Sequence, residues 1–406
     1  MKRRTFTAGL FLIAFCVALV VAMTAQGQRE QSQTPPVADH AVSGPYTHKN
    51  LTIFLLHDAG QSQSRAPLTL QEAMKRKLVI VRETGDVNRL TIQNRSSQDV
   101  FVQAGDIVKG GQQDRVLALD LIVPPKSGRV PIDAFCVEQG RWSRRGNEAV
   151  TAFSASDKAL ASKDLKIAAK ARKSQGDVWA NVSKTQEKLA MNMTVTPSAP
   201  PAPARARRGA GSASGGGPGA FVAPQALESL PTSSANGREN ATLYAPAAGL
   251  TLAEQSGLAS RASPSSLQLT LENKLVKDTA NDYVRNLTSI INGKRDVVGF
   301  VFAINGQINS ADVYSSNALF AKLWPKMLEA SAIEAIAELK AEEKSRLVDV
   351  IAIKAFLRES HTGKAETKKV TARTSVVKSE TGKNLFFETR DSSRNGKWVH
   401  RNYITK

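Results

Sequence analysis

The stretch "DVVGFVFAINGQINSADVY", residues 296–314, decides the fold class. Two alternating apolar runs flank Asn305 and Gly306 there. An Asn-Gly pair between such runs is typical of the two-residue turn of an antiparallel β-hairpin, because both turn residues take a positive φ. The stretch therefore predicts two paired strands and an antiparallel sheet.

Upstream of this hairpin, several short apolar or alternating runs read as strands. They cover 50–57, 77–83, 87–94, 99–105, 115–125 and 128–142. The run over 115–125 is read as one longer strand, because its leucines recur at period two. Strands this short and closely spaced, joined by turn residues, favour an antiparallel sandwich or partial barrel.

Helices are predicted on both sides of these strands. Thr69 followed by Glu72 has the spacing of a capping box and begins a short helix over 68–77. Helical composition extends over 156–191, with a break at Gly176. Further helices are expected over 267–291 and from Ser315 or Ser316 toward Leu339, the last with a kink or new first turn at Pro325. The predicted fold is α+β, an antiparallel β-rich core with packed helices.

These patterns divide the chain into six parts. They are a signal peptide over 1–27, a flexible tether over 28–41, a β-rich core with a helical end over 42–193, a disordered Pro-, Gly-, Ala- and Ser-rich insertion over 194–266, a helix–hairpin–helix unit over 267–341 that completes the same domain, and a basic C-terminal extension over 342–406 with strands at 374–379, 384–390 and 397–404.

The first residues predict export to the periplasm or the cell exterior. A basic start (Lys2–Arg4) precedes an apolar run over 8–23, and Ala25 and Gly27 suit cleavage after Gly27. The apolar run is shorter than the about 20 residues of a membrane span, and no other stretch of the sequence is long and apolar enough to be one. An anchor formed by the uncleaved signal is the alternative.

Two cysteines bear on stability. Cleavage would leave Cys136 without Cys16, so no internal disulfide is expected. We expect Cys136 to be a buried, small apolar residue rather than a reactive thiol.

The formal net charge of +19 favours acidic partners, which include anionic lipid, nucleic acid or an acidic polymer of the cell envelope. Residues 354–406 contribute 13 Lys and Arg against 5 Asp and Glu. No aromatic residues are interleaved with them as a stacking platform, so no dedicated nucleic-acid motif is predicted. The sequence does not indicate the oligomeric state.

"AGDIVKGGQQDR", residues 104–115, has the first glycine spacing of a phosphate-binding loop but lacks the Lys and Ser or Thr that the loop requires. Its polar density instead predicts a site for a polar ligand, or a solvated rim between strands. The candidate binding residues are Asp106, Lys109, Gly110, Gly111, Gln113, Asp114 and Arg115, with Gln112 beside them.

A second polar patch lies in "FCVEQGRW", residues 135–142. Glu138, Gln139, Arg141 and Trp142 combine an acid, an amide, a guanidinium and a stacking surface, which suits a ligand with a ring or a phosphate. The alternative is a Trp at the edge of the core beside ordinary surface charges.

Other chemistry has little support in the sequence. The five histidines have no metal-ligand spacing, and no nucleophile elbow occurs, so no metal or cofactor is predicted. Asp114 and Glu138 would serve as general acid and base if the fold brought them together.

Six segments occur in an order that resembles a known family. They are "NLTIFLL", "LTLQEAM", "VNRLTIQN", the long block over 104–142, "QGDVW" and the block over 297–328. Together they are similar to the ADP-ribosylglycohydrolase- and rhodanese-phosphatase-superfamily-associated domain, over about 42–340. The resemblance implies a link to ADP-ribose or NAD-related chemistry, carried by the matching residues 105–115 and 136–142.

The sequence identifies no reaction, and three functions stay open. The first is an exported ligand-binding module for an ADP-ribose-like or other polar ligand. The second is a hydrolase that acts on such a ligand through Asp114 and Glu138. The third is an interaction protein whose basic C-terminal residues bind anionic polymer or lipid.

Overall fold

The structure of the chain is a computed structural model that describes residues 40–62, 64–139, 153–195, 267–340 and 347–406. The predicted signal peptide, and the predicted insertion from residue 196 onward, lie outside the described residues.

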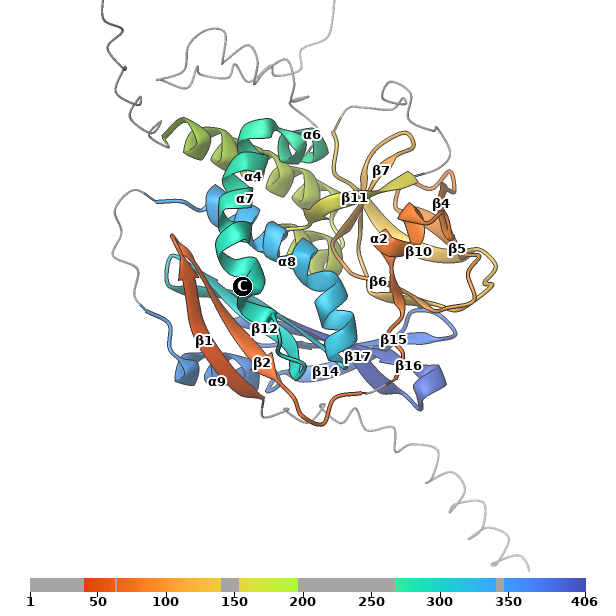
Figure 1. The fold of residues 1–406 in the computed structure, drawn as a ribbon. Helices are drawn as coiled ribbons and strands as arrows, with labels where there is room; N and C mark the ends of the chain where they lie inside the picture. Colours follow the sequence, from red (N-terminus) through yellow and green to blue (C-terminus); the bar gives the residue numbers. More distant parts are fainter. Residues whose placement is uncertain (1–39, 63, 140–152, 196–266, 341–346) are drawn as a thin grey trace, which may run out of the picture.

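A large antiparallel sheet carries the chain's first and last described strands (Figure 1). Its strand order is β1-β2-β12-β13-β17-β16-β15-β14. The bounds are β1 Ala41–His48, β2 Leu51–His57, β12 Val297–Ile304, β13 Gln307–Tyr314, β14 Lys364–Lys369, β15 Thr374–Glu380, β16 Asn384–Asp391 and β17 Lys397–Thr405.

The hairpin that decided the fold class is β12–β13. Asn305 has φ 51° and Gly306 has φ 72°, the two positive values that the Asn-Gly turn requires. Strand β2 pairs with the other edge of β12, so the hairpin lies inside the sheet.

Two smaller sheets form a nearly barrel-like unit beside the large one (Figure 1). The six-stranded sheet has the order β11-β7-β8-β10-β5-β4, and the three-stranded sheet has the order β3-β6-β9. The bounds are β3 Leu68–Thr69, β4 Val79–Glu83, β5 Arg89–Asn94, β6 Val100–Val102, β7 Asp106–Gly110, β8 Arg115–Leu117, β9 Leu121–Val123, β10 Val130–Cys136 and β11 Phe153–Leu160.

Helices pack between and around these sheets (Figure 1). Their bounds are α2 Leu70–Lys75, α3 Lys163–Lys166, the π-helix η1 Ile167–Arg172, α4 Gln175–Val195, α6 Leu267–Glu272, α7 Lys274–Leu287, the 3₁₀ turn η2 Thr288–Ile291, α8 Asn317–Ala337, α9 Val350–Glu359 and the 3₁₀ turn η3 Ser392–Arg394. No helix among the described residues is long and apolar enough to span a membrane.

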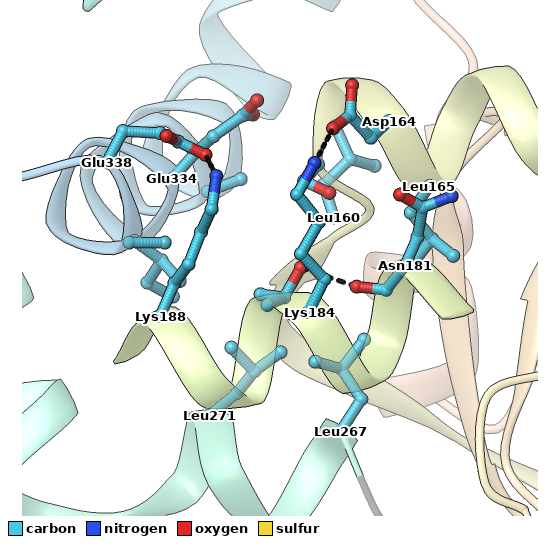
Figure 2. A pocket seen from close by; sticks show the side chains of 15 residues that line it. Leu160, Asp164, Leu165, Asn181, Lys184, Lys188, Leu267, Leu271, Glu334 and Glu338 are labelled. Carbon is cyan, nitrogen blue, oxygen red and sulfur yellow. Dashed lines mark hydrogen bonds and ion pairs between the residues drawn. The ribbon is translucent and has the colours of Figure 1, made fainter. Parts of the chain in front are cut away.

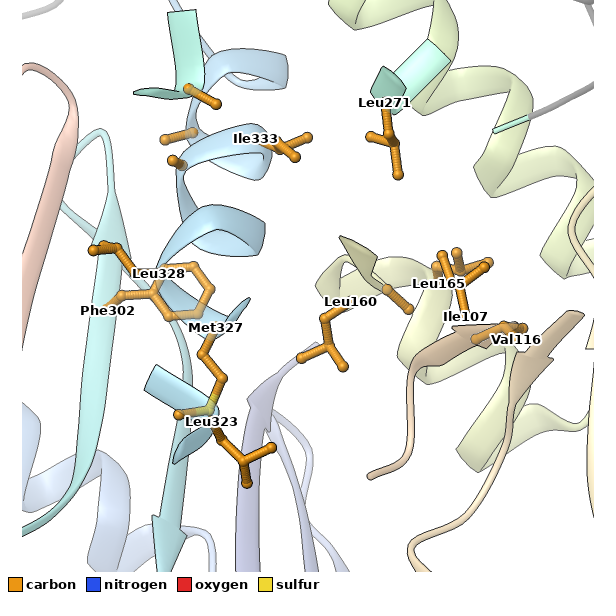
Figure 3. Close-up of a cluster of buried hydrophobic side chains, with 14 of the residues drawn as sticks. Ile107, Val116, Leu160, Leu165, Leu271, Phe302, Leu323, Met327, Leu328 and Ile333 are labelled. Atoms are coloured by element: carbon orange, nitrogen blue, oxygen red, sulfur yellow. The ribbon is translucent and has the colours of Figure 1, made fainter. Parts of the chain in front are cut away.

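Helix α8 joins the two halves of the core. Its side chains pack against β12 on one side, where Phe320 and Trp324 contact Phe300, and face the barrel-like unit on the other (Figure 3). The buried apolar side chains around α8 form one cluster that extends from the large sheet to the barrel-like unit. The two halves therefore share one core. The labelled members in Figure 3 are Ile107, Val116, Leu160, Leu165, Leu271, Phe302, Leu323, Met327, Leu328 and Ile333.

Several predicted elements are confirmed, including the α+β class. Thr69 and Glu72 form the complete capping box of α2. Ser316 caps α8 through a hydrogen bond from Leu319 N, and α8 continues through Pro325 as one helix. Cys136 is a buried free thiol, and burial raises its pKa.

The single strand predicted over 115–125 is wrong. The chain forms β8, leaves the six-stranded sheet, and pairs again as β9 in the three-stranded sheet. The break contains Asp120, whose buried carboxylate accepts a hydrogen bond from Ala104 N at 2.7 Å. A buried carboxylate needs such donors, and a continuous strand in one sheet does not supply them.

The predicted helix over 156–191 is also only partly right. Residues 153–160 form β11, which pairs with β7 because the sheet edge supplies backbone partners that override local composition. The helical break lies at Lys173, which has φ 53°, and Gly176 falls within α4. The helix predicted over 267–291 is divided at Asn273, which caps α7.

The C-terminal residues are not appended to a finished domain. Strand β17 lies between β13 and β16, so residues 397–405 are in the interior of the large sheet. The three predicted C-terminal strands are confirmed, and β14 adds an edge strand.

Candidate functional site

The polar stretch over 104–115 forms the β7–β8 hairpin, and its two ends have different neighbours. Ile107 pairs with Val116, which fixes the register. Asp106, at one end, contacts the ammonium group of Lys326 on α8 and accepts a hydrogen bond from Gln103 N at 3.0 Å. The predicted patch is therefore divided between two polar clusters.

The other end holds the Arg115 cluster, which we define as Glu83, Gln113, Asp114, Arg115 and Glu138. The Arg115 guanidinium is 1% exposed and donates from Nη1 to the Gln113 carbonyl at 2.8 Å. Its Nη2 lies 3.7 Å from Glu83 Oε2. This cluster brings together predicted residues from both sequence patches.

Buried polar atoms without partners mark the Arg115 cluster. The side-chain amide of Gln113 is fully buried, and neither its nitrogen nor its oxygen has a hydrogen-bond partner among the described residues. Arg115 Nε is unpaired in the same way within the described part of the chain. Buried polar groups are nearly always hydrogen-bonded, so this trio of atoms calls for a partner such as water or a ligand.

The two candidate catalytic carboxylates lie just outside two paired strands, Asp114 directly before β8 and Glu138 two residues after β10. Asp114 Oδ1 accepts a hydrogen bond from Gly110 N at 2.9 Å, and Val137 N donates to the Asp114 carbonyl at 3.0 Å. Glu138 follows directly and is 1% exposed. The fold thus places both carboxylates in one buried region.

Gly111 allows a close approach at the hairpin turn. It has φ 59°, and a Cβ atom there would lie 2.5 Å from Glu83 Oε1 and 2.7 Å from Phe153 Cζ. The neighbouring amide of Gln112 donates to Glu83 Oε1 at 3.2 Å. Only glycine leaves room for Glu83 and Phe153 to close over this turn.

The remaining predicted residues are placed as follows. Lys109 is partly exposed and pairs with Glu272 of α6 at 2.7 Å. Gln139 is exposed. Arg141 and Trp142 lie outside the described residues, so their share in the site stays a prediction.

A second cluster, the His400 cluster, was not foreseen. We define it as Asp120, Asp312, His400, Lys166 and Lys170. His400 of β17 bonds Asp120 Oδ2 through Nδ1 at 2.8 Å and Asp312 Oδ1 through Nε2 at 3.0 Å. All five side chains are buried.

Neutral groups complete the bonding of this cluster. Thr389 donates to Asp120 Oδ2 at 2.6 Å, and Asn402 donates to Asp312 Oδ1 at 2.9 Å. The Tyr314 ring stacks on His400 with centroids 4.5 Å apart. Burial raises the pKa of the Tyr314 phenol well above its usual value, and the nearby aspartates add to that effect.

Charges inside apolar runs were the signal for this second cluster. Asp120 interrupts "LALDLIV", Asp312 lies in "INSADVY" and His400 follows "KWV". A charged residue at a core position of a strand needs a buried partner. The sequence could have flagged each residue, but it could not pair them, because they lie far apart along the chain.

A groove opens elsewhere, where helices α3, α4, α6 and α8 meet (Figure 2). Lys184 lies 3.6 Å from Asp164, and Lys188 contacts Glu338. Burial raises the pKa of Glu334, which accepts a hydrogen bond from Asn309 at 2.8 Å. None of the predicted site residues lines this groove.

Comparison with known families gives a match over most of the chain. The family model described as "ARG and Rhodanese-Phosphatase-superfamily-associated Protein domain" matches residues 39–404. This range extends past the predicted limit near residue 340 and includes the C-terminal strands of the large sheet. Neither the curated proteins nor the solved structures give a match.

Proposed function

We propose that this chain, which belongs to the ARG and Rhodanese-Phosphatase-superfamily-associated Protein domain family, is a module that binds a polar small ligand at the Arg115 cluster. The observation that carries the proposal is the buried Gln113 amide, which, like Nε of the nearby Arg115, has no hydrogen-bond partner among the described residues. A ligand that supplies the missing donor and acceptor would recover the free energy that these groups lose on burial.

The two side chains suggest the class of ligand. An amide offers a donor and an acceptor side by side, which matches the edge of an adenine or a carboxamide. A guanidinium suits phosphate oxygens. An ADP-ribose-like molecule carries both kinds of group, and Lys109 and Gln112 at the hairpin turn would contact its outer part.

The basic, apolar and small residues of the first 27 positions support an exported form of the protein, with the signal either cleaved or retained as an anchor.

The test is thermal melting of purified protein spanning 28–406, which contains every described residue, with and without ADP-ribose. A ligand at about 100 times its dissociation constant adds about 2.7 kcal/mol to the free energy of unfolding. We expect a clear rise in Tm for the natural sequence. No rise would reject an ADP-ribose-like ligand.

Gln113→Leu sharpens this test, and Gln103→Leu is its matched control. Both residues carry a buried amide, but Gln103 lies outside the Arg115 cluster, where its side chain interacts with the Tyr314 phenol. Gln113→Leu should melt no lower than the parent without ligand, because an amide without a partner among the described residues is removed from the interior. Only Gln113→Leu should lose the shift with ADP-ribose, and an equal loss in both variants would contradict the proposed site.

A hydrolase is the second candidate, favoured by the position of Asp114 and Glu138 at the adjoining ends of β8 and β10, which are paired. One carboxylate would take the proton of a water molecule while the other gives a proton to the leaving group. Product release from ADP-ribose, reduced at least about 100-fold by Glu138→Gln, would support it. A natural chain that binds ADP-ribose and releases no product would reject hydrolysis of this ligand and keep binding.

Binding of anionic polymer is a third candidate, and one observation favours it. Lys364, Lys368 and Lys369 are exposed on β14, the edge strand of the large sheet. Affinity for a polyanion should fall steeply with salt and should fall further when the three lysines are changed to Gln. Unchanged affinity in that variant would reject this surface.

A further inference from the structure

The His400 cluster is a chain of five charged groups with a cation at each end. Lys170 Nζ lies 3.9 Å from Asp120 Oδ2, and Lys166 Nζ lies 3.9 Å from Asp312 Oδ2. His400 joins the two aspartates at the centre. The order is therefore Lys170, Asp120, His400, Asp312 and Lys166.

The charge of the central group follows from its two hydrogen bonds together with the ionised state of both aspartates. Burial opposes their ionisation, but nearby cations lower their pKa values. Ionised carboxylates only accept hydrogen bonds, so both ring nitrogens of His400 must carry hydrogen to bond the two aspartates. His400 is then an imidazolium. With both lysines protonated, the five groups hold three positive and two negative charges, which leaves one positive charge over. Burial lowers the pKa of Lys170, so a charged Lys170 needs a nearby anion.

Glu334 is a further buried carboxylate near Lys166, but burial raises its pKa, and it accepts hydrogen bonds from Asn309 and from Lys163 N. Two other ion-paired groups do not balance the excess either. Asp106 of β7 and Lys326 of α8 contact each other and are neutral as a pair. On β16 and β17, Glu388 bonds Arg401 at 2.7 Å and Arg390 at 2.6 Å, so its charge is already shared between two cations.

Lys170 lacks the hydrogen bonds that a buried ammonium requires. Its Nζ has no hydrogen-bond partner among the described residues, and its one favourable ring contact is with Phe387, whose centroid lies 4.3 Å away. The nearest carboxylate, Asp120, already receives hydrogen bonds from Ala104, Thr389 and His400. An ammonium buried in this way is unfavourable without an acceptor.

The two lysines are held on one side of the cluster by a rare backbone form. Lys166 ends α3, and Lys170 lies four residues later in the π-helix η1. Short π-helical segments often occur at functional sites. Both ammonium groups approach the same chain of carboxylates, and each stops short of a direct hydrogen bond.

We propose that Lys166 and Lys170 bind one small monovalent anion, such as dihydrogen phosphate or a carboxylate. The anion supplies acceptors to the two ammonium groups and cancels the excess charge. This site is separate from the Arg115 cluster, because it lies at the other end of the β7–β8 hairpin and includes none of that cluster's residues.

The experiment uses protein spanning 28–406 in a buffer whose only anion is a bulky sulfonate. Chloride, acetate and inorganic phosphate are each titrated at constant ionic strength, and Tm is recorded. We expect a saturable rise in Tm with at least one of them. The three anions distinguish a site for a spherical anion from one for a carboxylate or a phosphate. A Tm that does not change with any of them would overturn the proposal.

Lys170→Met is the diagnostic variant, and Lys173→Met is its control. Lys173 is substantially exposed and pairs with Asp133 at 3.2 Å, so its loss removes a charge of the same sign just outside the cluster. Lys170→Met should weaken the apparent anion affinity at least tenfold, and Lys173→Met should leave it unchanged. Equal anion responses in the two variants would overturn the site.

Calorimetry on the natural sequence keeps the test independent of how the variants fold. The anion that raises Tm should bind at one site per chain, and Lys166→Met should weaken that binding at least tenfold. Saturable binding that survives both lysine substitutions would place the anion elsewhere and reject the proposal.

Discussion

Asp120 and His400 are hydrogen-bonded at 2.8 Å although 280 residues separate them along the chain. Asp120 belongs to the connection between β8 and β9 of the barrel-like unit, and His400 lies on β17 of the large sheet. The bond is buried at both ends. The two halves of the molecule are therefore joined by charged groups as well as by the apolar core around α8.

Replacing His400 should change how the free energy of unfolding depends on pH. Burial disfavours its imidazolium, but Asp120 and Asp312 reverse this effect and raise the pKa of His400 above 6.5. Its stabilisation is therefore complete below pH 6.5 and lost as the pH rises through the folded-state pKa. Burial likewise opposes ionisation of Asp120 and Asp312, but nearby cations lower their pKa values below 3.8, so their contribution is lost only in stronger acid.

We therefore expect His400→Gln to lower the free energy of unfolding by about 3 kcal/mol between pH 4 and 6.5, with the difference shrinking in alkali. Urea unfolding across pH measures it. His57→Gln is the control, because His57 pairs with a half-exposed Asp296 and should contribute less. A difference between natural and variant chains that grows toward alkaline pH would contradict the assigned charge.

Thr374→Val should loosen the junction between the two halves. Its hydroxyl accepts a buried hydrogen bond from Ile122 N of β9 at 3.0 Å. Valine keeps the shape but leaves that amide unpaired, which should cost about 1–3 kcal/mol. Guanidinium unfolding of this variant is compared with that of Thr367→Val on the exposed part of β14, for which we expect almost no change.

Gly111→Ala should destabilise the hairpin turn of the Arg115 cluster. The added methyl meets Glu83 and Phe153 in a positive-φ backbone, which alone costs about 1–2 kcal/mol. We expect a lower Tm and weaker binding of ADP-ribose. Gly128→Ala has nothing within 4 Å of the added atom and should leave both values unchanged.

Removing residues 364–406 should prevent folding. The deletion takes away β14 to β17 and exposes β13, whose partner is β17. It also removes His400 and leaves Asp120 and Asp312 without it. Circular dichroism and limited proteolysis of the truncated chain check this, and a stable, cooperatively melting fragment would show that the remaining strands suffice.

Most elements of the fold were predicted from residues that lie close together in the sequence. The turn at Asn305–Gly306, the capping box at Thr69 and the cap at Ser316 each depend on neighbours within a few residues. Sequence reasoning failed where a distant partner decided the outcome. Residues 153–160 became β11 because β7 offered a free edge, and the strand over 115–125 broke so that the Asp120 carboxylate could reach its donors.

For the candidate site, too, sequence reasoning depended on whether the residues lie in neighbouring or in distant parts of the chain. The two polar patches of the sequence lie close together because β8 and β10 are paired in one sheet. That they form a binding site stays a prediction. The His400 cluster draws on β13, β17 and η1, and no local pattern relates them. Asp106 was grouped with Arg115 by proximity in sequence, but it faces Lys326.

The position of β2 has a consequence for how the chain acquires its structure. Leu51 of β2 pairs with Ile304 of β12, so this edge of an apolar strand stays open until a far later part of the chain is present. Contacts this distant slow folding, because a long loop must close before they form. We expect slow refolding in which the β1–β2 hairpin is the segment most prone to aggregate while it waits for β12.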